Sequence, residues 1–169
     1  MKAIYLISAL LIAGLSSVPT SGRVSALSPS RDSLAVADFD YSDTSKEATD
    51  QQAQHSKRIA DFTQTLRKDV AAGDRFTLVD LHCPADNCSA GNMTAEELVE
   101  AARQSHADIL VFGGIRKMST LVQWIQVRAL DLRTMKVVAD KTLTFRGDSD
   151  DAWQHAARYV GGLIDGMNP

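Results

Sequence analysis

Hydrophobic and polar positions along the first half of the chain change from strand-like to helix-like spacing. Leu34–Asp40 is apolar on both faces until its acidic end, which predicts a buried strand. Over 48–71 the apolar residues recur at steps of three or four, and Gly73 follows them, which predicts one amphipathic helix. Lys57 and Arg58 lie on the outward face of that helix and are expected to be solvated.

Two further strands and a second helix are predicted in the middle of the chain. Arg75–Leu81 has the composition of a strand, and Thr94–Glu97 has the form of a capping box, which predicts a helix over about 95–105. Ile109–Phe112 is the most apolar of the predicted strands, so we expect it at the centre of the sheet. The glycine pair at 113–114 is expected to end or bend this strand.

Strict alternation in the last third of the chain predicts a long hairpin. The outgoing strand covers Leu121–Leu130, the turn lies near Asp131–Met135, and the return strand covers Lys136–Phe145. The apolar residues predicted to share a face are Ile125, Val127 and Ala129 in the first strand and Val137, Ala139, Leu143 and Phe145 in the second. Asp140, Thr142 and Thr144 share the other face, so one side of the hairpin is expected to be wet.

The chain is predicted to end in a helix, which completes the order β-α-β-α-β-β-β-α. Asp148–Asp151 supplies acids where the helix macrodipole favours them, and an apolar stripe runs from Trp153 to Ile164. Two right-handed crossovers would make the first three strands parallel, and the hairpin would extend them antiparallel. The predicted fold is therefore α+β, α/β-like in its order, with one mixed five-stranded sheet, a C-terminal β-hairpin and three packed helices. We expect a single domain over 34–169.

The first 26 residues have the pattern of a secretory signal peptide. Lys2 precedes the apolar run Ala3–Leu15, and Val24-Ser25-Ala26 fits a signal-peptidase site, with the triplet at 20–22 as a nearby alternative. The run is shorter than the roughly 20 residues that a spanning helix needs, so cleavage after Ala26 is favoured over a membrane anchor. We expect a periplasmic or secreted protein, with residues 27–33 as a flexible lead-in and no stable membrane span.

Composition and charge exclude several classes of protein. The chain has 169 residues, of which 44% are hydrophobic and 23% charged, and this excludes a disordered chain and a cysteine-dense mini-protein. Its net charge is −3, and loss of Lys2 and Arg23 with the signal peptide makes it −5. Because the basic residues are scattered among acids, nucleic acid is not an expected partner.

The two cysteines are predicted to form a disulfide. Cys83 and Cys88 are the only cysteines, and their spacing in a proline-containing loop lets their Cα atoms come within bonding range. A disulfide is the usual state of such a pair in an oxidising compartment. The alternatives are a redox-active pair, which the spacing disfavours, and a zinc or copper site. A metal site would combine this loop with histidines chosen from His55, His82, His106 and His155.

The remaining polar clusters supply no catalytic constellation. Asp38, Asp40 and Asp43 end the first strand, and Asp148, Asp150 and Asp151 form a second acidic group; both resemble turn and helix caps more than calcium loops. The sequence has no phosphate-binding loop and no nucleophile elbow. We therefore predict no catalytic residues, no metal and no cofactor.

One group of residues has the composition of an interaction surface. Trp124 falls on the polar side of its predicted strand, together with Arg128, and Arg116 and Lys117 lie just upstream. Tryptophan and arginine are the residues most often found as anchors at protein interfaces. The alternative is that a helix covers this face and makes Trp124 part of the core.

Four segments resemble an uncharacterised family of secreted bacterial proteins. They are Val36–Phe39, Ala107–Gly113, the turn Asp131-x-x-Thr134 and the stretch Phe145–Trp153; the family pattern places a glycine after Thr134, where this chain has Met135. In fold the family is similar to the amino-terminal domain of TolB and the periplasmic part of CsgG. The resemblance implies a periplasmic binding or assembly module without known catalytic residues.

The expected function is therefore a non-enzymatic module that binds another periplasmic or envelope protein through the hairpin and its neighbourhood. The alternative is a carrier of a small ligand or a metal ion, which would use the acidic strand ends or the cysteine loop.

Overall fold

The computed structural model describes residues 31–48, 50–84 and 87–168. The predicted signal peptide at 1–26 and most of the lead-in at 27–33 lie outside this part of the chain. Within it, none of the helices is long and apolar enough to cross a membrane.

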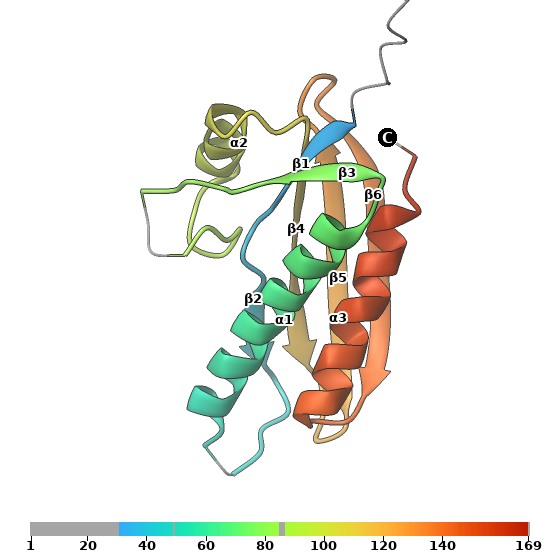
Figure 1. The fold of residues 1–169 in the computed structure, drawn as a ribbon. Coiled ribbons are helices and arrows are strands. Elements are labelled where there is room, and N and C mark those ends of the chain that lie inside the picture. The colour runs from blue at the N-terminus through green and yellow to red at the C-terminus, as the bar shows by residue number, and fades with distance from the viewer. Residues whose placement is uncertain (1–30, 49, 85–86, 169) are drawn as a thin grey trace, which may run out of the picture. The chain divides into compact units, whose positions relative to one another are not determined.

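One mixed sheet forms the centre of the described chain (Figure 1), and the five predicted strand regions are all found in it. Its main path runs β3 (Phe76–Val79), β1 (Asp32–Val36), β4 (Ile109–Lys117), β5 (Val122–Asp131) and β6 (Lys136–Arg146). β1 pairs in parallel with β3 and β4, whereas β4, β5 and β6 are antiparallel. The predicted α+β class, parallel strands and antiparallel hairpin are confirmed.

The sheet has six strands because the first predicted strand is interrupted. β1 pairs with the first half of β4, and β2 (Asp40–Asp43) pairs in parallel with its second half. Between them Asp38 forms a separate bridge to Ser89, and the ring of Phe39 turns into the core. The prediction of one continuous strand over Leu34–Asp40 was wrong in this respect.

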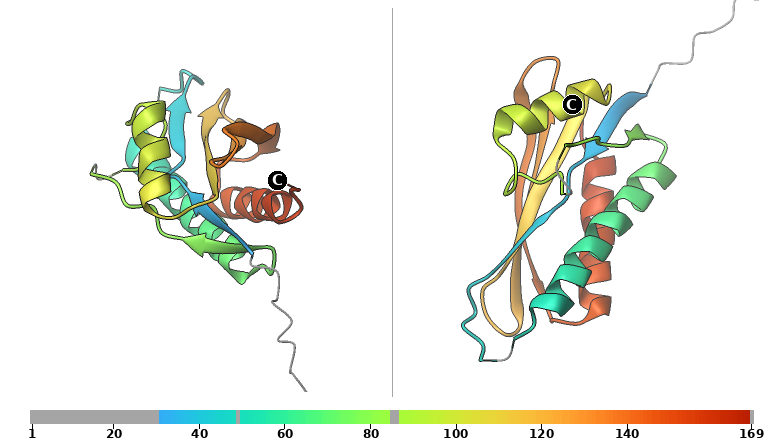
Figure 2. Two further views of the ribbon diagram at one scale, coloured as in Figure 1. Left: turned by 90° about the horizontal axis from the view of Figure 1, so that it is seen from above. Right: turned by 90° about the vertical axis from the view of Figure 1, so that its left-hand side faces the viewer.

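Three helices cover the sheet unequally (Figure 2). α1 (Gln52–Ala72) and α3 (Asp150–Asp165) lie side by side on one face, where Phe62 and Trp153 pack with Val36, Ile115 and Ile125 in the larger core. α2 (Ala95–Gln104) lies on the other face, where its leucine and alanines meet β1 and the first half of β4 in a smaller core. None of the helices in the described part of the chain covers the rest of that second face.

β4 continues through its glycine pair instead of ending there. A Cβ added to Gly113 would lie 2.0 Å from the carbonyl oxygen of Gln126 and 2.9 Å from the ring of Phe39. Only glycine therefore lets β5 and Phe39 approach β4 at this point. Of the two predicted roles for 113–114, ending the strand was wrong, because β4 continues through these glycines to Lys117.

The hairpin has the predicted strands and one irregularity. The register between β5 and β6 shifts at Ala129 and Leu130, which face Ala139 and Val137, so Val138 is the extra residue of a β-bulge. Val137 was predicted to share the buried face with Ala139 and Leu143. Because of the bulge it does not, and its side chain is 57% exposed. Beyond the bulge the predicted alternation holds, with Leu143 and Phe145 against the larger core.

Two predicted local features are present at the ends of elements. Thr94 and Glu97 form the capping box at the start of α2, with Thr94 Oγ1 accepting from the backbone N–H of Glu97. Met135 takes up a left-handed conformation, with φ of 55°, at the position where the family pattern has glycine. The hairpin turn thus keeps a backbone conformation that favours glycine although the residue is methionine.

Candidate protein-binding face

The side of the hairpin that faces away from α1 and α3 is the candidate binding face. It is defined by alternate residues of three strands, which are Gly114 and Arg116 in β4, Trp124, Gln126 and Arg128 in β5, and Asp140, Thr142 and Thr144 in β6. α2 covers the neighbouring part of the sheet, over Ala35 and Leu110, and stops short of these residues. We call this surface the open hairpin face.

A groove with a volume of about 480 Å³ runs over the open hairpin face. The floor of the groove is low over Gly114, because this residue has no side chain to fill the space between Phe112 and Arg116 on the same face of β4. Trp124 lines the groove and is 44% exposed, so the alternative of a core tryptophan under a helix is wrong. A large, rigid aromatic side chain that stays in water on a folded surface is typical of an interface anchor.

Two of the predicted arginines also lie on this face, and both line the groove. Arg116 is exposed, is paired directly across the strands with Trp124, and forms no ion pair with the described residues. Arg128 donates from Nε to Asp140 Oδ2 at 3.2 Å, across β5 and β6. The open hairpin face therefore offers one tryptophan and one arginine, Arg116, that forms no ion pair with the residues that the structure describes.

Lys117 does not belong to this surface, and its assignment there was wrong. Successive residues of a strand point to opposite faces, so Lys117 points away from Arg116, into the layer under α1 and α3. Its side chain is fully buried, and Nζ donates to Asp148 Oδ2 at 2.7 Å, Gln51 Oε1 at 2.7 Å and Glu47 Oε2 at 2.9 Å. A buried ammonium with three acceptors is structural.

Asp148 is the centre of a buried ionic cluster that the sequence analysis did not predict. Its carboxylate accepts from Lys117 Nζ, from Arg58 Nη1 at 2.7 Å, from His55 Nε2 at 2.9 Å and from Trp153 Nε1 at 3.3 Å. Burial alone would raise the pKa of Asp148, but the hydrogen bonds from Lys117 and His55 outweigh it and hold the pKa below the usual 3.8. The carboxylate is therefore ionised and neutralises its cationic neighbours.

Arg58 was expected on a solvated helix face, but it is 7% exposed and also donates to Asp150 Oδ1 at 2.8 Å. Part of the cluster could have been predicted from the alternation of β4. Lys117 lies two residues after the apolar Ile115, so both side chains are on the buried face. His55 is buried at 2% exposure beneath the stacked ring of Tyr41, and burial together with the Asp43 carboxylate raises the pKa of Tyr41.

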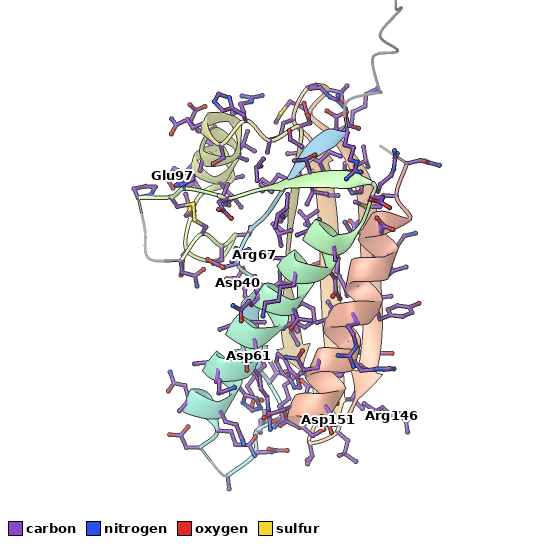
Figure 3. The ribbon with its side chains drawn as sticks, viewed as in Figure 1. Asp40, Asp61, Arg67, Glu97, Arg146 and Asp151 are labelled. Carbon is purple, nitrogen blue, oxygen red and sulfur yellow. A yellow bond between two sulfur atoms is a disulfide. The ribbon has the colours of Figure 1, made fainter. Side chains whose placement is uncertain are left out.

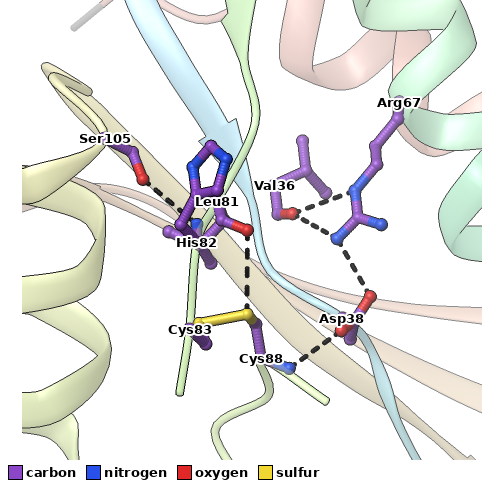
Figure 4. Close-up of a disulfide and its surroundings, with 8 residues drawn as sticks. All are labelled: Val36, Asp38, Arg67, Leu81, His82, Cys83, Cys88 and Ser105. Atoms are coloured by element: carbon purple, nitrogen blue, oxygen red, sulfur yellow. Dashed lines mark hydrogen bonds and ion pairs between the residues drawn. A yellow bond between two sulfur atoms is a disulfide. The ribbon is translucent and has the colours of Figure 1, made fainter. Parts of the chain in front are cut away.

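The predicted disulfide between Cys83 and Cys88 is present, with Cα atoms 5.7 Å apart (Figure 4). Asp38 accepts from the backbone N–H of Cys88 at 2.9 Å and from Arg67 Nη2 at 2.9 Å. The cysteine loop is thereby attached to the break between β1 and β2 and to α1. Because both sulfurs are in the disulfide, neither is available as a thiolate ligand for zinc or copper.

The acidic ends of β1 and β2 are also occupied by structural contacts. Asp40 accepts from Ser89 Oγ at 2.6 Å and from the backbone N–H of Gly91 at 2.8 Å, and Asp43 accepts from Ser45. These bonds fasten loops, as predicted for caps and turns. Within residues 31–48, 50–84 and 87–168, no three His, Cys, Asp or Glu side chains are grouped so that they could hold a metal ion.

Comparisons with known proteins find solved structures of similar fold and a family whose model matches this chain. The computed model is similar to the hypothetical protein CT253 from Chlamydia trachomatis, with 13% identity, a TM-score of 0.56, and coverage of 81% of this chain and 97% of that one. It is also similar to the PelC dodecamer structure from Paraburkholderia phytofirmans, with 15% identity, a TM-score of 0.50, and coverage of 80% and 87%. At such low identity these likenesses show the fold alone.

TolB from Acinetobacter baumannii is another structural neighbour, with 12% identity and a TM-score of 0.49, and the match covers 80% of this chain but 27% of TolB. A search of curated proteins found no match. The family model DUF3280, described as "Protein of unknown function (DUF2380)", matches residues 32–162. This match covers nearly all of the described fold, so the chain belongs to that family of proteins of unknown function.

Proposed function

We propose that this chain is a non-enzymatic binding or assembly module of the bacterial envelope, and that it binds a partner protein through the open hairpin face. The observation that carries the proposal is the position of Trp124, which lies exposed in a groove on a face that no described helix covers. A folded domain that buries its other tryptophan, Trp153, to 1% exposure leaves this one in water.

The charges of the face support a protein partner. Arg116 is directly beside Trp124 and forms no ion pair with the described residues, so a carboxylate of the partner can pair with it. Arg128 is already paired with Asp140 and is partly exposed, which places it at the polar rim of such an interface. The groove thus combines an aromatic anchor with a free cation.

Export to the periplasm is part of the proposal. The pattern of residues 1–26 and the disulfide of Cys83 with Cys88 both support an oxidising compartment outside the cytoplasm. Amino-terminal sequencing of the protein recovered from the periplasm of a Gram-negative host should give Leu27 as the first residue. A protein that keeps Met1 and stays in the cytoplasm would contradict export.

The binding role is tested by capture from periplasmic extract with the mature protein as bait. The wild type and Gln64→Ala, a control on the exposed face of α1, should retain the same discrete partner, whereas Trp124→Ala and Arg116→Glu should lose it. Truncation of a hot-spot tryptophan typically costs about 2 kcal/mol or more, which lowers affinity by roughly 30-fold. Recovery of the same partner by all four proteins, or of none by the wild type, would contradict the proposal.

A further inference from the structure

The second surface of interest is the free edge of the sheet. β6 is an outer strand that pairs only with β5, and it runs over the 11 residues Lys136–Arg146. Its outer backbone N–H and C=O groups have no strand partner among the residues that the structure describes. A long free edge of this kind is a template for another strand unless charges guard it.

A cavity of about 590 Å³ lies beside this edge, between β6 and α3. Apolar side chains from both elements line it, with Leu143 and Phe145 from β6 and Ala152, Ala156 and Tyr159 from α3. Tyr159 is 61% exposed. Because side chains of a strand alternate between faces, a strand added to β6 would send every second side chain toward this cavity.

The charge of this edge differs in sign from that of the whole chain. β6 carries Lys136, Lys141 and Arg146 against a single acid, Asp140, which Arg128 already engages. The whole chain has a net charge of −3. Figure 3 shows Arg146 where β6 ends. A strand that pairs with this edge therefore meets more cations than acids, with Lys136 and Lys141 on the face toward α3 and Arg146 on the opposite face.

The same charges disfavour a second copy of this chain as the occupant. In a symmetric antiparallel pair of β6 strands centred on residue 141, Lys141 would face Lys141 of the second copy. Like charges directly opposite each other destabilise a strand pair. An acidic strand would instead place carboxylates beside these cations, which favours pairing and speeds encounter.

We propose that the edge of β6 and the adjoining β6–α3 cavity bind an extended acidic segment of a partner protein by strand addition. Backbone hydrogen bonds to β6 hold the segment, its apolar side chains beside Leu143 and Phe145 fill the cavity, and carboxylates further along the same face pair with Lys141 and Lys136. This inference rests on the proposed function, because it takes the ligand to be a protein, and it adds the mode of binding and the chemistry of the bound segment.

Two labelled nonapeptides test the inference. In both, every second residue is threonine, and the residues between are valine in one half of the peptide and glutamate, or lysine in the second peptide, in the other half. Fluorescence anisotropy with the mature protein should show saturable binding of the glutamate peptide, at least about tenfold tighter than the lysine peptide. Lys141→Glu should weaken the glutamate peptide about tenfold, whereas Lys68→Glu, the same charge change on exposed α1, should leave it unchanged. Tyr159→Ala should also weaken it, because this change removes one wall of the cavity.

Hydrogen exchange locates the bound peptide. Amides of β6 should exchange more slowly with the glutamate peptide present, while those of β3, the opposite edge, should not change. Equal binding of both peptides, no binding of either, an unchanged affinity of Lys141→Glu, or protection at β3 would each overturn the inference. In those cases Trp124-dependent capture of a periplasmic protein would still support the proposed function, so the two failures are distinguishable.

Discussion

Asp148 joins three elements through one carboxylate. It accepts hydrogen bonds from Lys117 at the end of β4, from His55 and Arg58 in α1 and from Trp153 in α3. From the sequence this aspartate was assigned to the acidic start of the last helix, which is true only of its neighbours Asp150 and Asp151. The assignment failed because Lys117, Arg58 and His55 lie 31 to 93 positions away, and no local pattern records such contacts.

Replacing Asp148 should destabilise the fold strongly. Asp148→Asn leaves the buried Lys117 and Arg58 without their shared counterion, and breaking a buried ion pair typically costs about 3–5 kcal/mol. Urea denaturation should show this loss in the free energy of unfolding. Asp151→Asn is the matched control, because Asp151 is exposed in the first turn of α3, and it should have little effect. Equal effects of the two substitutions would contradict the cluster.

The same cluster makes stability depend on pH. The pKa of Asp148 lies below its usual 3.8 in the folded protein, so its contribution is present above the unfolded pKa and is lost as pH falls through the folded value. The free energy of unfolding should therefore decrease between about pH 5 and pH 2, and the decrease should be shallower in Asp148→Asn. Parallel pH profiles of the two proteins would show that Asp148 does not titrate in this way.

At Met135, in contrast to Asp148, a substitution is expected to stabilise the fold. Its φ of 55° costs a non-glycine residue roughly 1–2 kcal/mol, whereas glycine adopts this conformation freely but loses more backbone entropy on folding. Met135→Gly should therefore raise the free energy of unfolding by roughly 0.5–1 kcal/mol. Thr134→Gly, in the same turn but without a positive φ, should lower it. A destabilising Met135→Gly would contradict the turn conformation.

At the scale of elements, periodicity predicted the type and approximate place of all three helices and of the hairpin. It did not predict the interruption between β1 and β2 or the full length of β4. Both depend on the close approach of Phe39 and Gln126 to Gly113, which is a contact between distant segments. The bulge at Val138 likewise shifts the face of Val137 without any local signal in the sequence.

The close approach at Gly113 can be tested directly. Gly113→Ala would place its Cβ 2.0 Å from the carbonyl oxygen of Gln126, so β4 and β5 would have to separate. Overpacking of this kind typically costs about 1–3 kcal/mol, and thermal unfolding should show it as a lower melting temperature. Gly162→Ala is the matched control, because its Cβ meets nothing within 4 Å and alanine favours a helix by about 0.5–1 kcal/mol. Similar melting temperatures for the two variants would contradict the packing.

At the scale of the whole molecule, the uneven distribution of helices creates the surfaces that matter. α1 and α3 cover one face of the sheet and α2 covers part of the other, so the open hairpin face and the edge of β6 remain bare. Arg116 and Lys117 were grouped with this face only because they lie just upstream, and Lys117 is in fact buried. Alternation in the sequence placed Trp124 and Arg128 on the wet face, and the strand pairing agrees with this. It could not decide whether a helix covers them, because the placement of α2 is a tertiary property.

Trp124 is the proposed point of contact with a partner protein. The most direct measurement is photo-crosslinking in intact cells, with p-benzoylphenylalanine in place of Trp124 or, as the control, in place of Gln64 on α1. The account predicts one discrete crosslinked product at position 124 that disappears with Arg116→Glu, and no product at position 64. The absence of a product at 124, or the same product at both positions, would contradict it.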